Sequence, residues 1–238
     1  MYYFDEYVMG YDINDLDINY KYHHSYRVMD NMINLAKSLG LDKDDIYLAK
    51  VIGILHDIGR FEQDKLYNSF IDKKMDHGTY GALYLKKSNL LEKFNISKDD
   101  YNVVYKAIFN HNKFSIEDGL NDRELLFSKM IRDADKIDII YVLGNPYLKK
   151  ELRQDDSYIS PLVRKTFFEN KPILIDNVFS KNDSLMVIFC FIYDINFKNS
   201  FEIIYDKDYY NKIYNRIIRK DIFNEYIDYV NSYIEKNK

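Results

Sequence analysis

The sequence predicts an all-α fold, a helical bundle with additional helices in its C-terminal part. Two observations support this class. The 238 residues include only 8 glycines and 3 prolines, and so few helix breakers favour long helices over many short strands. Apolar residues also recur at steps of three and four along most of the chain, which is the period of a helix with one buried face.

Five helices are expected in the first part of the chain. The first starts at His24 and stops before Gly40, and Asp44 or Asp45 is expected to cap the second. Ser97 is expected to cap the fourth. The expected helices cover residues 24–39, 44–59, 77–85, 97–111 and 123–142, and residues 62–75 are expected to form a loop.

Pro146 marks a break, so we expect residues 1–145 to form a helical core and residues 146–238 a helical extension packed on it. The apolar run from Leu185 to Tyr193 is rich in β-branched and aromatic residues, which would also suit a strand. The segments on both sides of this run favour helix, and we assign it to the extension.

Composition excludes several classes of protein. The single cysteine, Cys190, rules out an intrachain disulfide framework and fits a reducing compartment. We expect no signal peptide and no membrane span, since no apolar run approaches the roughly 20 residues that a span needs, and therefore expect a cytoplasmic protein. A net charge of -4 argues against an extended nucleic-acid-binding surface, but a few local cations can still hold a small phosphate-containing substrate.

Histidines and carboxylates in the first part of the chain carry the chemical signal. The pair His56 and Asp57 follows an apolar helix and is expected to be buried, where a carboxylate is costly unless it is paired or binds a metal. Asp135 directly follows Ala134, which is expected to lie on the buried side of the fifth helix. Each residue also has a plain structural interpretation: His24 could simply start a helix, and Asp135 could be a surface residue paired with a neighbouring cation.

Three segments together resemble the HD-domain superfamily of metal-dependent phosphohydrolases, whose signature is a His, an adjacent His-Asp pair and a distant Asp. The segments run from His24 to Val28, from Leu55 to Arg60, and through Asp135 and Lys136. The resemblance covers roughly residues 20 to 145 and implies a metal-binding helical core. Two further histidines, His77 and His111, lie between the pair and the distant Asp, as in the two-metal subgroup. That subgroup includes nucleotide and cyclic-dinucleotide phosphohydrolases and a few di-iron oxygenases.

The resemblance implies two divalent metal ions, with Mn, Fe, Co, Ni, Mg and Zn all compatible with imidazole and carboxylate ligands. Asp57 is implied to bridge the two ions, and His23 is expected to lie outside the ligand set because His24 matches the signature. The alternative for the two further histidines is that they bind substrate phosphate or cap helices. The implied metal ligands are His24, His56, Asp57, His77, His111 and Asp135.

The resemblance further implies a phosphohydrolase that attacks a nucleotide, or a related small phosphate ester or anhydride, with a metal-activated water. Cations are needed where charge develops on phosphoryl oxygens, although each candidate could instead be a solvated surface charge. The expected catalytic residues are Asp57, Asp135, Arg60 and Lys136, and the expected substrate-binding residues are Arg27, Arg60 and Lys113. Two other functions stay open, a mixed-valent di-iron oxygenase and a non-catalytic nucleotide-binding regulatory module. The sequence also leaves pairing into a homodimer open.

Overall fold

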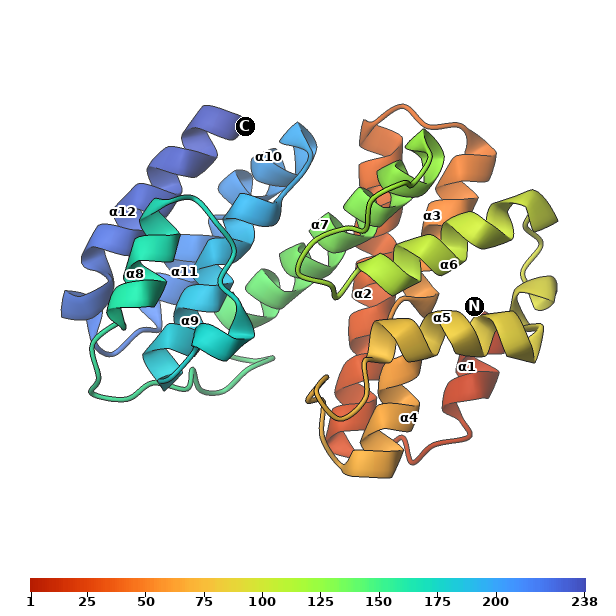
Figure 1. Ribbon diagram of the computed structural model, residues 1–238, viewed down its shortest axis with the longest axis horizontal. Helices are drawn as coiled ribbons and strands as arrows, with labels where there is room; N and C mark the ends of the chain where they lie inside the picture. Colours follow the sequence, from red (N-terminus) through yellow and green to blue (C-terminus); the bar gives the residue numbers. More distant parts are fainter. The chain divides into compact units, whose positions relative to one another are not determined.

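A computed structural model describes residues 1–238, and helices, turns and loops make up the whole chain (Figure 1). The all-α class is therefore confirmed. The α-helices are α1 (Tyr2–Val8), α2 (Leu16–Ser38), α3 (Lys43–Leu55), α4 (Ile58–Tyr67), α5 (His77–Ser88), α6 (Tyr101–Asn110), α7 (Asp122–Gly144), α8 (Pro161–Phe168), α9 (Lys181–Phe189), α10 (Lys198–Asp206), α11 (Tyr209–Asn215) and α12 (Lys220–Asn237). Short 3-10 helices are η1 (Leu90–Lys93), η2 (Lys98–Asp100), η3 (Ile175–Asn177) and η4 (Cys190–Asp194).

The chain divides into two compact units, Met1–Asp135 and Lys136–Lys238, and the division falls inside α7. In the first unit α2 packs along α3, α4 packs on α5, and α5 packs on α6. All six residues predicted as metal ligands belong to this unit.

Side-chain caps set the start of α2 and α3. Asp15 has extended backbone geometry, and its carboxylate accepts hydrogen bonds from the backbone N–H groups of Asp17 and Ile18. Helix α2 therefore begins well before the expected start, and His24 lies within the helix rather than at its first residue. Asp42 caps α3, so the expectation of a cap at Asp44 or Asp45 was wrong.

The predicted loop over residues 62–75 was wrong in its first half, because α4 continues to Tyr67. Phe61 on α4 is fully buried and packs edge-on against Phe4 of α1, which ties this helix to the body of the unit. The loop begins at Asn68, whose φ of 46° lies in the left-handed region that ends many helices. We call residues 68–76 the α4–α5 loop.

Two glycines let the helices around the predicted site approach closely. A Cβ atom at Gly59 would collide with the backbone carbonyl oxygen of His77 at the start of α5. A Cβ atom at Gly78 would collide with the side chain of Asn112, just after α6. Only glycine permits these contacts, and they draw the starts of α4 and α5 and the end of α6 together.

The second unit has a core of its own, built from apolar residues of α8 to α12, with Met186, Phe189 and Tyr210 almost inaccessible to solvent. The run from Leu185 to Tyr193 is helical, in α9 and η4, so the strand alternative is excluded. No helix in the structure combines the length and the apolar character that crossing a membrane requires.

Candidate metal centre

Six side chains predicted as metal ligands meet in the first unit. His56 ends α3, Asp57 follows it in the turn before α4, and His77 is the first residue of α5. His111 directly follows α6. His24 and Asp135 come from within α2 and α7. Five of the six are buried, and Asp135 keeps 19% of its side chain exposed.

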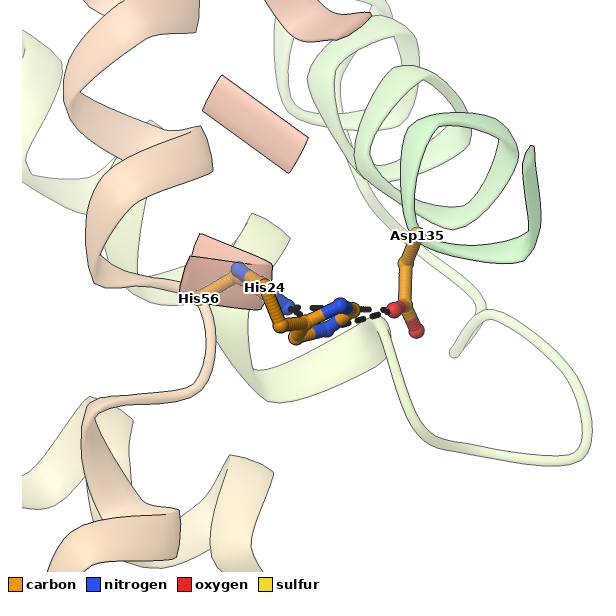
Figure 2. Close-up of side chains that lie close together, drawn as sticks. All are labelled: His24, His56 and Asp135. Atoms are coloured by element: carbon orange, nitrogen blue, oxygen red, sulfur yellow. Dashed lines mark hydrogen bonds and ion pairs between the residues drawn. The ribbon is translucent and has the colours of Figure 1, made fainter. Parts of the chain in front are cut away.

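His24, His56 and Asp135 form one group of donor atoms. The Nε2 atom of His24 lies 3.2 Å from Nε2 of His56 and 3.1 Å from Oδ1 of Asp135. Nε2 of His56 lies 3.8 Å from the same Asp135 oxygen. Figure 2 shows the two imidazole rings directed toward the carboxylate that α7 presents. These atoms could all contact one small cation.

His77 and His111 form a second group, and Asp57 lies between the two groups. The Nε2 atoms of His77 and His111 are 2.9 Å apart. Asp57 Oδ1 is 3.1 Å from the His77 nitrogen and 3.5 Å from the His111 nitrogen. Asp57 Oδ2 is 3.4 Å from Nε2 of His24 and 3.6 Å from Nε2 of His56. Each oxygen of this carboxylate therefore faces a different pair of imidazoles, as a bridging ligand does.

Hydrogen bonds to Nδ1 direct the Nε2 atoms into the centre. The Nδ1 atom of His56 donates to the carbonyl oxygen of Gly53 at 2.7 Å, and that of His111 donates to the carbonyl oxygen of Ile108 at 2.6 Å. Nδ1 of His77 donates to Oδ1 of Asp72 at 2.7 Å. A neutral imidazole that donates through Nδ1 carries a lone pair on Nε2, the arrangement found in metal-binding histidines.

This donor set fits divalent metal ions. Lone pairs on His77 and His111 that face each other at 2.9 Å repel unless a cation lies between them. Nitrogen and oxygen ligands lie about 2.0–2.2 Å from a metal such as zinc, which places neighbouring ligand atoms about 3.0–3.5 Å apart. Most of the separations in both groups lie close to this range. Imidazole and carboxylate ligands without a thiolate are compatible with the whole set of metals named above.

The protonation states also suit metal binding. Burial lowers the pKa of His56 to about 3 and lowers the pKa of His111, so both rings are neutral near pH 7. Burial alone would raise the pKa of Asp57, but the Lys21 ammonium holds it well below its ordinary value. Burial would likewise raise the pKa of Asp135, and His24 lowers it instead. Both carboxylates are ionised.

The structure adds residues that the sequence reasoning missed. The Nζ atom of Lys21 lies 2.6 Å from Asp57 Oδ2, and only 13% of its side chain is exposed. Lys21 precedes His24 by one helical turn and so shares its face of α2, a spacing that could have been used to find it. Asp72, the partner of His77, lies in the α4–α5 loop, where no periodic signal marks a residue.

The predicted substrate-binding cations have different surroundings. Arg60 Nη1 donates to Gln63 Oε1, to the carbonyl oxygen of Phe70 and to Asp72 Oδ1, at 2.7 to 2.9 Å. Arg60 Nε is buried without a hydrogen-bond partner and lies 3.8 Å from Asp57 Oδ1.

The other predicted cations are each placed differently. Lys113 Nζ pairs with the Asp76 carboxylate at 2.6 and 2.7 Å and lies over the Phe109 ring. Lys136 pairs with Asp194 at 2.7 Å, a contact within the second unit. Arg27 is half-buried on α2, one turn after His24, and His23 is exposed.

Comparison with known proteins agrees with this centre. A family model described as HD domain matches residues 22–140, which is half of the chain and includes every residue of both donor groups. No curated protein and no solved structure matches the chain significantly. The chain therefore belongs to the HD domain family, whose members are generally metal-dependent phosphohydrolases.

Proposed function

We propose that this protein is a phosphohydrolase that uses two divalent metal ions to cleave a nucleotide or a related small phosphate ester or anhydride. One observation carries the proposal: Asp57 presents one oxygen to His24 and His56 and the other to His77 and His111. Two ions held by these residues would supply Lewis-acid polarisation of the phosphoryl group and a water activated for in-line displacement.

The side chains divide the remaining work. His24, His56 and Asp135 would hold one ion, His77 and His111 the other, and Asp57 both. Asp135 is the most exposed of these ligands and would also orient the attacking water. Its ionised state suits this role, because it can accept a hydrogen bond from that water.

Cations near Asp57 would bind the phosphate. Arg60 Nε is a buried donor that lacks an acceptor 3.8 Å from Asp57 Oδ1, and a phosphoryl oxygen at the centre would satisfy it. The Lys21 ammonium, 2.6 Å from Asp57 Oδ2, supplies a second positive charge at the same place. We also propose that Arg27 and Lys113 bind substrate and that Lys136 takes part in catalysis.

The test is phosphate or nucleotide release from a panel of nucleotides and small phosphate compounds, with the protein loaded separately with Mn, Fe, Co, Ni, Mg or Zn. We expect turnover with at least one metal, and a loss of more than about 100-fold in Asp57→Ala, since loss even of an outer-shell partner costs 10–100-fold. Asp30→Ala, an exposed position on α2, is the matched control and should retain activity. No turnover in any protein shown to be metal-loaded would refute the proposal.

The same six ligands and bridging carboxylate would also suit a mixed-valent di-iron oxygenase. Oxygen consumption by the iron-loaded, partly reduced protein in the presence of a small polyol or phosphonate would favour that function. Binding limited to Mg or Zn would exclude it. A purely regulatory nucleotide-binding role is less consistent with a complete set of ligands, because a site without chemistry has no need of them.

A further inference from the structure

Three histidines of the centre differ in the group that accepts a hydrogen bond from Nδ1. His56 and His111 donate to carbonyl oxygens three residues earlier in their own helices, which are fixed parts of the backbone. His77 instead donates to a side chain, that of Asp72 in the α4–α5 loop. The Nδ2 atom of Asn112 also lies 3.3 Å from this nitrogen, but an amide N–H cannot accept the Nδ1 proton. The acceptor that holds this proton is therefore supplied by the loop.

Several contacts hold Asp72 in place. Its Oδ1 accepts hydrogen bonds from Arg60 Nη1 at 2.9 Å and from Gln63 Nε2 at 3.3 Å. Its Oδ2 accepts one from Asn112 Nδ2 at 3.3 Å. The same Arg60 and Gln63 side chains donate to backbone carbonyl oxygens of the loop at 2.8 and 2.6 Å, so they fix the loop and its carboxylate together.

Phe70, another residue of the α4–α5 loop, lies near a cation of α4 and a cation of α2. The ring of Phe70 lies 5.5 Å from the Arg60 guanidinium and 5.4 Å from Lys21 Nζ, within reach of cation–π attraction to both. Asp72 itself keeps 38% of its side chain exposed, while only 2% of the His77 side chain is exposed. A solvent-accessible loop thus reaches one of the least accessible ligands.

We propose that Asp72 is a positioning residue for His77, through which the α4–α5 loop controls binding of the cation held by His77, His111 and Asp57. The proposal rests on the two-ion function above. With Asp72 in place, the His77 proton stays on Nδ1 and its Nε2 lone pair points at the cation. Without it, the ring can carry its proton on Nε2 or rotate, and either change removes a ligand. His56, a histidine of the other group, donates from Nδ1 to a backbone carbonyl oxygen of its own helix instead.

The experiment is a titration of the chelator-treated protein with Mn²⁺. Calorimetry and the electron paramagnetic resonance signal of free Mn²⁺ both measure the binding. Wild type should bind two ions per chain. Asp72→Ala should bind one ion as wild type does and the other about 10–100-fold more weakly, the usual effect of losing an outer-shell partner. Asp72→Asn should be intermediate, since its amide oxygen still accepts from Nδ1 but carries no charge for Arg60.

Asp99→Ala, at an exposed position of η2, is the matched control and should bind both ions as wild type does. Nitrogen-15 spectra of labelled histidines provide a readout independent of binding, because Asp72→Ala should shift the His77 Nδ1 and Nε2 signals toward the other tautomer while those of His56 stay unchanged. Circular dichroism establishes that each variant is folded, and Asp72→Asn carries the test if Asp72→Ala is not.

Two results would overturn the inference: wild-type affinity for the second ion in the Asp72 variants, or equal weakening of both ions. If wild type itself binds fewer than two ions, the two-ion function fails and the inference fails with it. Two ions in wild type with no selective loss in the variants would overturn the inference alone.

Discussion

The Lys21 ammonium and the Asp57 carboxylate form an ion pair of 2.6 Å in a part of the molecule that is nearly closed to water. A buried carboxylate that loses its cationic partner is strongly destabilising. A metal ion bound to the same carboxylate would supply much of the missing positive charge. The importance of Lys21 for stability should therefore depend on whether the centre holds metal.

We predict that Lys21→Met lowers the free energy of unfolding of the metal-free protein by about 1–3 kcal/mol, less than for a fully buried pair. With saturating Mn²⁺ the loss should be clearly smaller. Urea denaturation in chelator and in Mn²⁺ measures both values. Lys37→Met, at an exposed position of the same helix, is the control and should have little effect in either condition. An equal loss with and without Mn²⁺ would show that Lys21 does not act through the charge of Asp57.

The sequence predicted the six candidate ligands that the structure brings together, but not the residues that support them. His24, the His56-Asp57 pair and Asp135 form a short signature with fixed order, so a resemblance could carry them. Lys21 and Asp72 act through contacts that depend on how helices and loops pack, and Asp72 reaches His77 from an irregular segment. Arg60 shows the same limit, since its residue type suggested phosphate binding but not its hydrogen bonds to Gln63 of α4 and to Phe70 and Asp72 of the loop.

At the scale of elements, the close approach of α4 to α5 depends on Gly59, because a Cβ there would collide with the His77 carbonyl oxygen. We predict that Gly59→Ala lowers the free energy of unfolding by about 1–3 kcal/mol, as overpacking does, and weakens the ion held by His77. Denaturant unfolding and Mn²⁺ titration measure the two effects.

Gly119→Ala is the control for Gly59→Ala. Gly119 has φ +81° and open space around its Cβ position, so this change brings only backbone strain of about 1 kcal/mol. It should leave the binding of two ions intact. Wild-type stability and metal binding in Gly59→Ala would contradict the role given to this contact.

The segment after α6 is tied back to that helix by Glu117. Its Oε1 atom lies 3.0 Å from Lys106 Nζ and accepts a hydrogen bond from Asn110 Nδ2 at 3.1 Å. Burial alone would raise the pKa of Glu117, but these two partners lower it below its ordinary value. The native state therefore binds this proton less readily than the unfolded chain does.

We predict that Glu117→Gln costs less than about 1 kcal/mol at neutral pH, because the pair is about one-third exposed and screened by water. A carboxylate with a lowered pKa in the folded state stabilises that state above its unfolded pKa, and this stabilisation is lost as the pH falls through the folded pKa. The difference in free energy of unfolding between wild type and variant should therefore be complete above about pH 5 and should shrink below about pH 4. Denaturant unfolding of metal-free protein at several pH values measures it. Glu92→Gln, whose side chain forms no salt bridge, is the control, and a gap that persists in acid would contradict the assignment.

Helices with strong caps and apolar periodicity were predicted with the right class but imperfect ends. Asp15 extends α2 by two turns beyond the expected start, because the apolar pattern before His24 is weak while the cap is strong. The turn at Asp57 was missed, since its φ of -100° and ψ of 17° reflect packing of α4 rather than a glycine or proline signal. Only tertiary packing distinguishes one long helix from α3 followed by α4.

At the scale of the whole molecule, the sequence predicted a helical core followed by a helical extension. The predicted boundary after residue 145 follows the end of α7, whereas the compact units meet at Asp135, within that helix. A break in the chain is visible in a sequence as a proline or a loss of periodicity. A change in which core a continuous helix joins leaves no such mark.

The most direct test of the two-ion centre is anomalous X-ray diffraction from crystals of the full-length protein loaded with Mn²⁺. We predict two manganese peaks in the first unit, one bound by His24, His56 and Asp135 and the other by His77 and His111, with Asp57 contacting both. A single peak, or manganese bound elsewhere with these six side chains free of metal, would contradict the central claim.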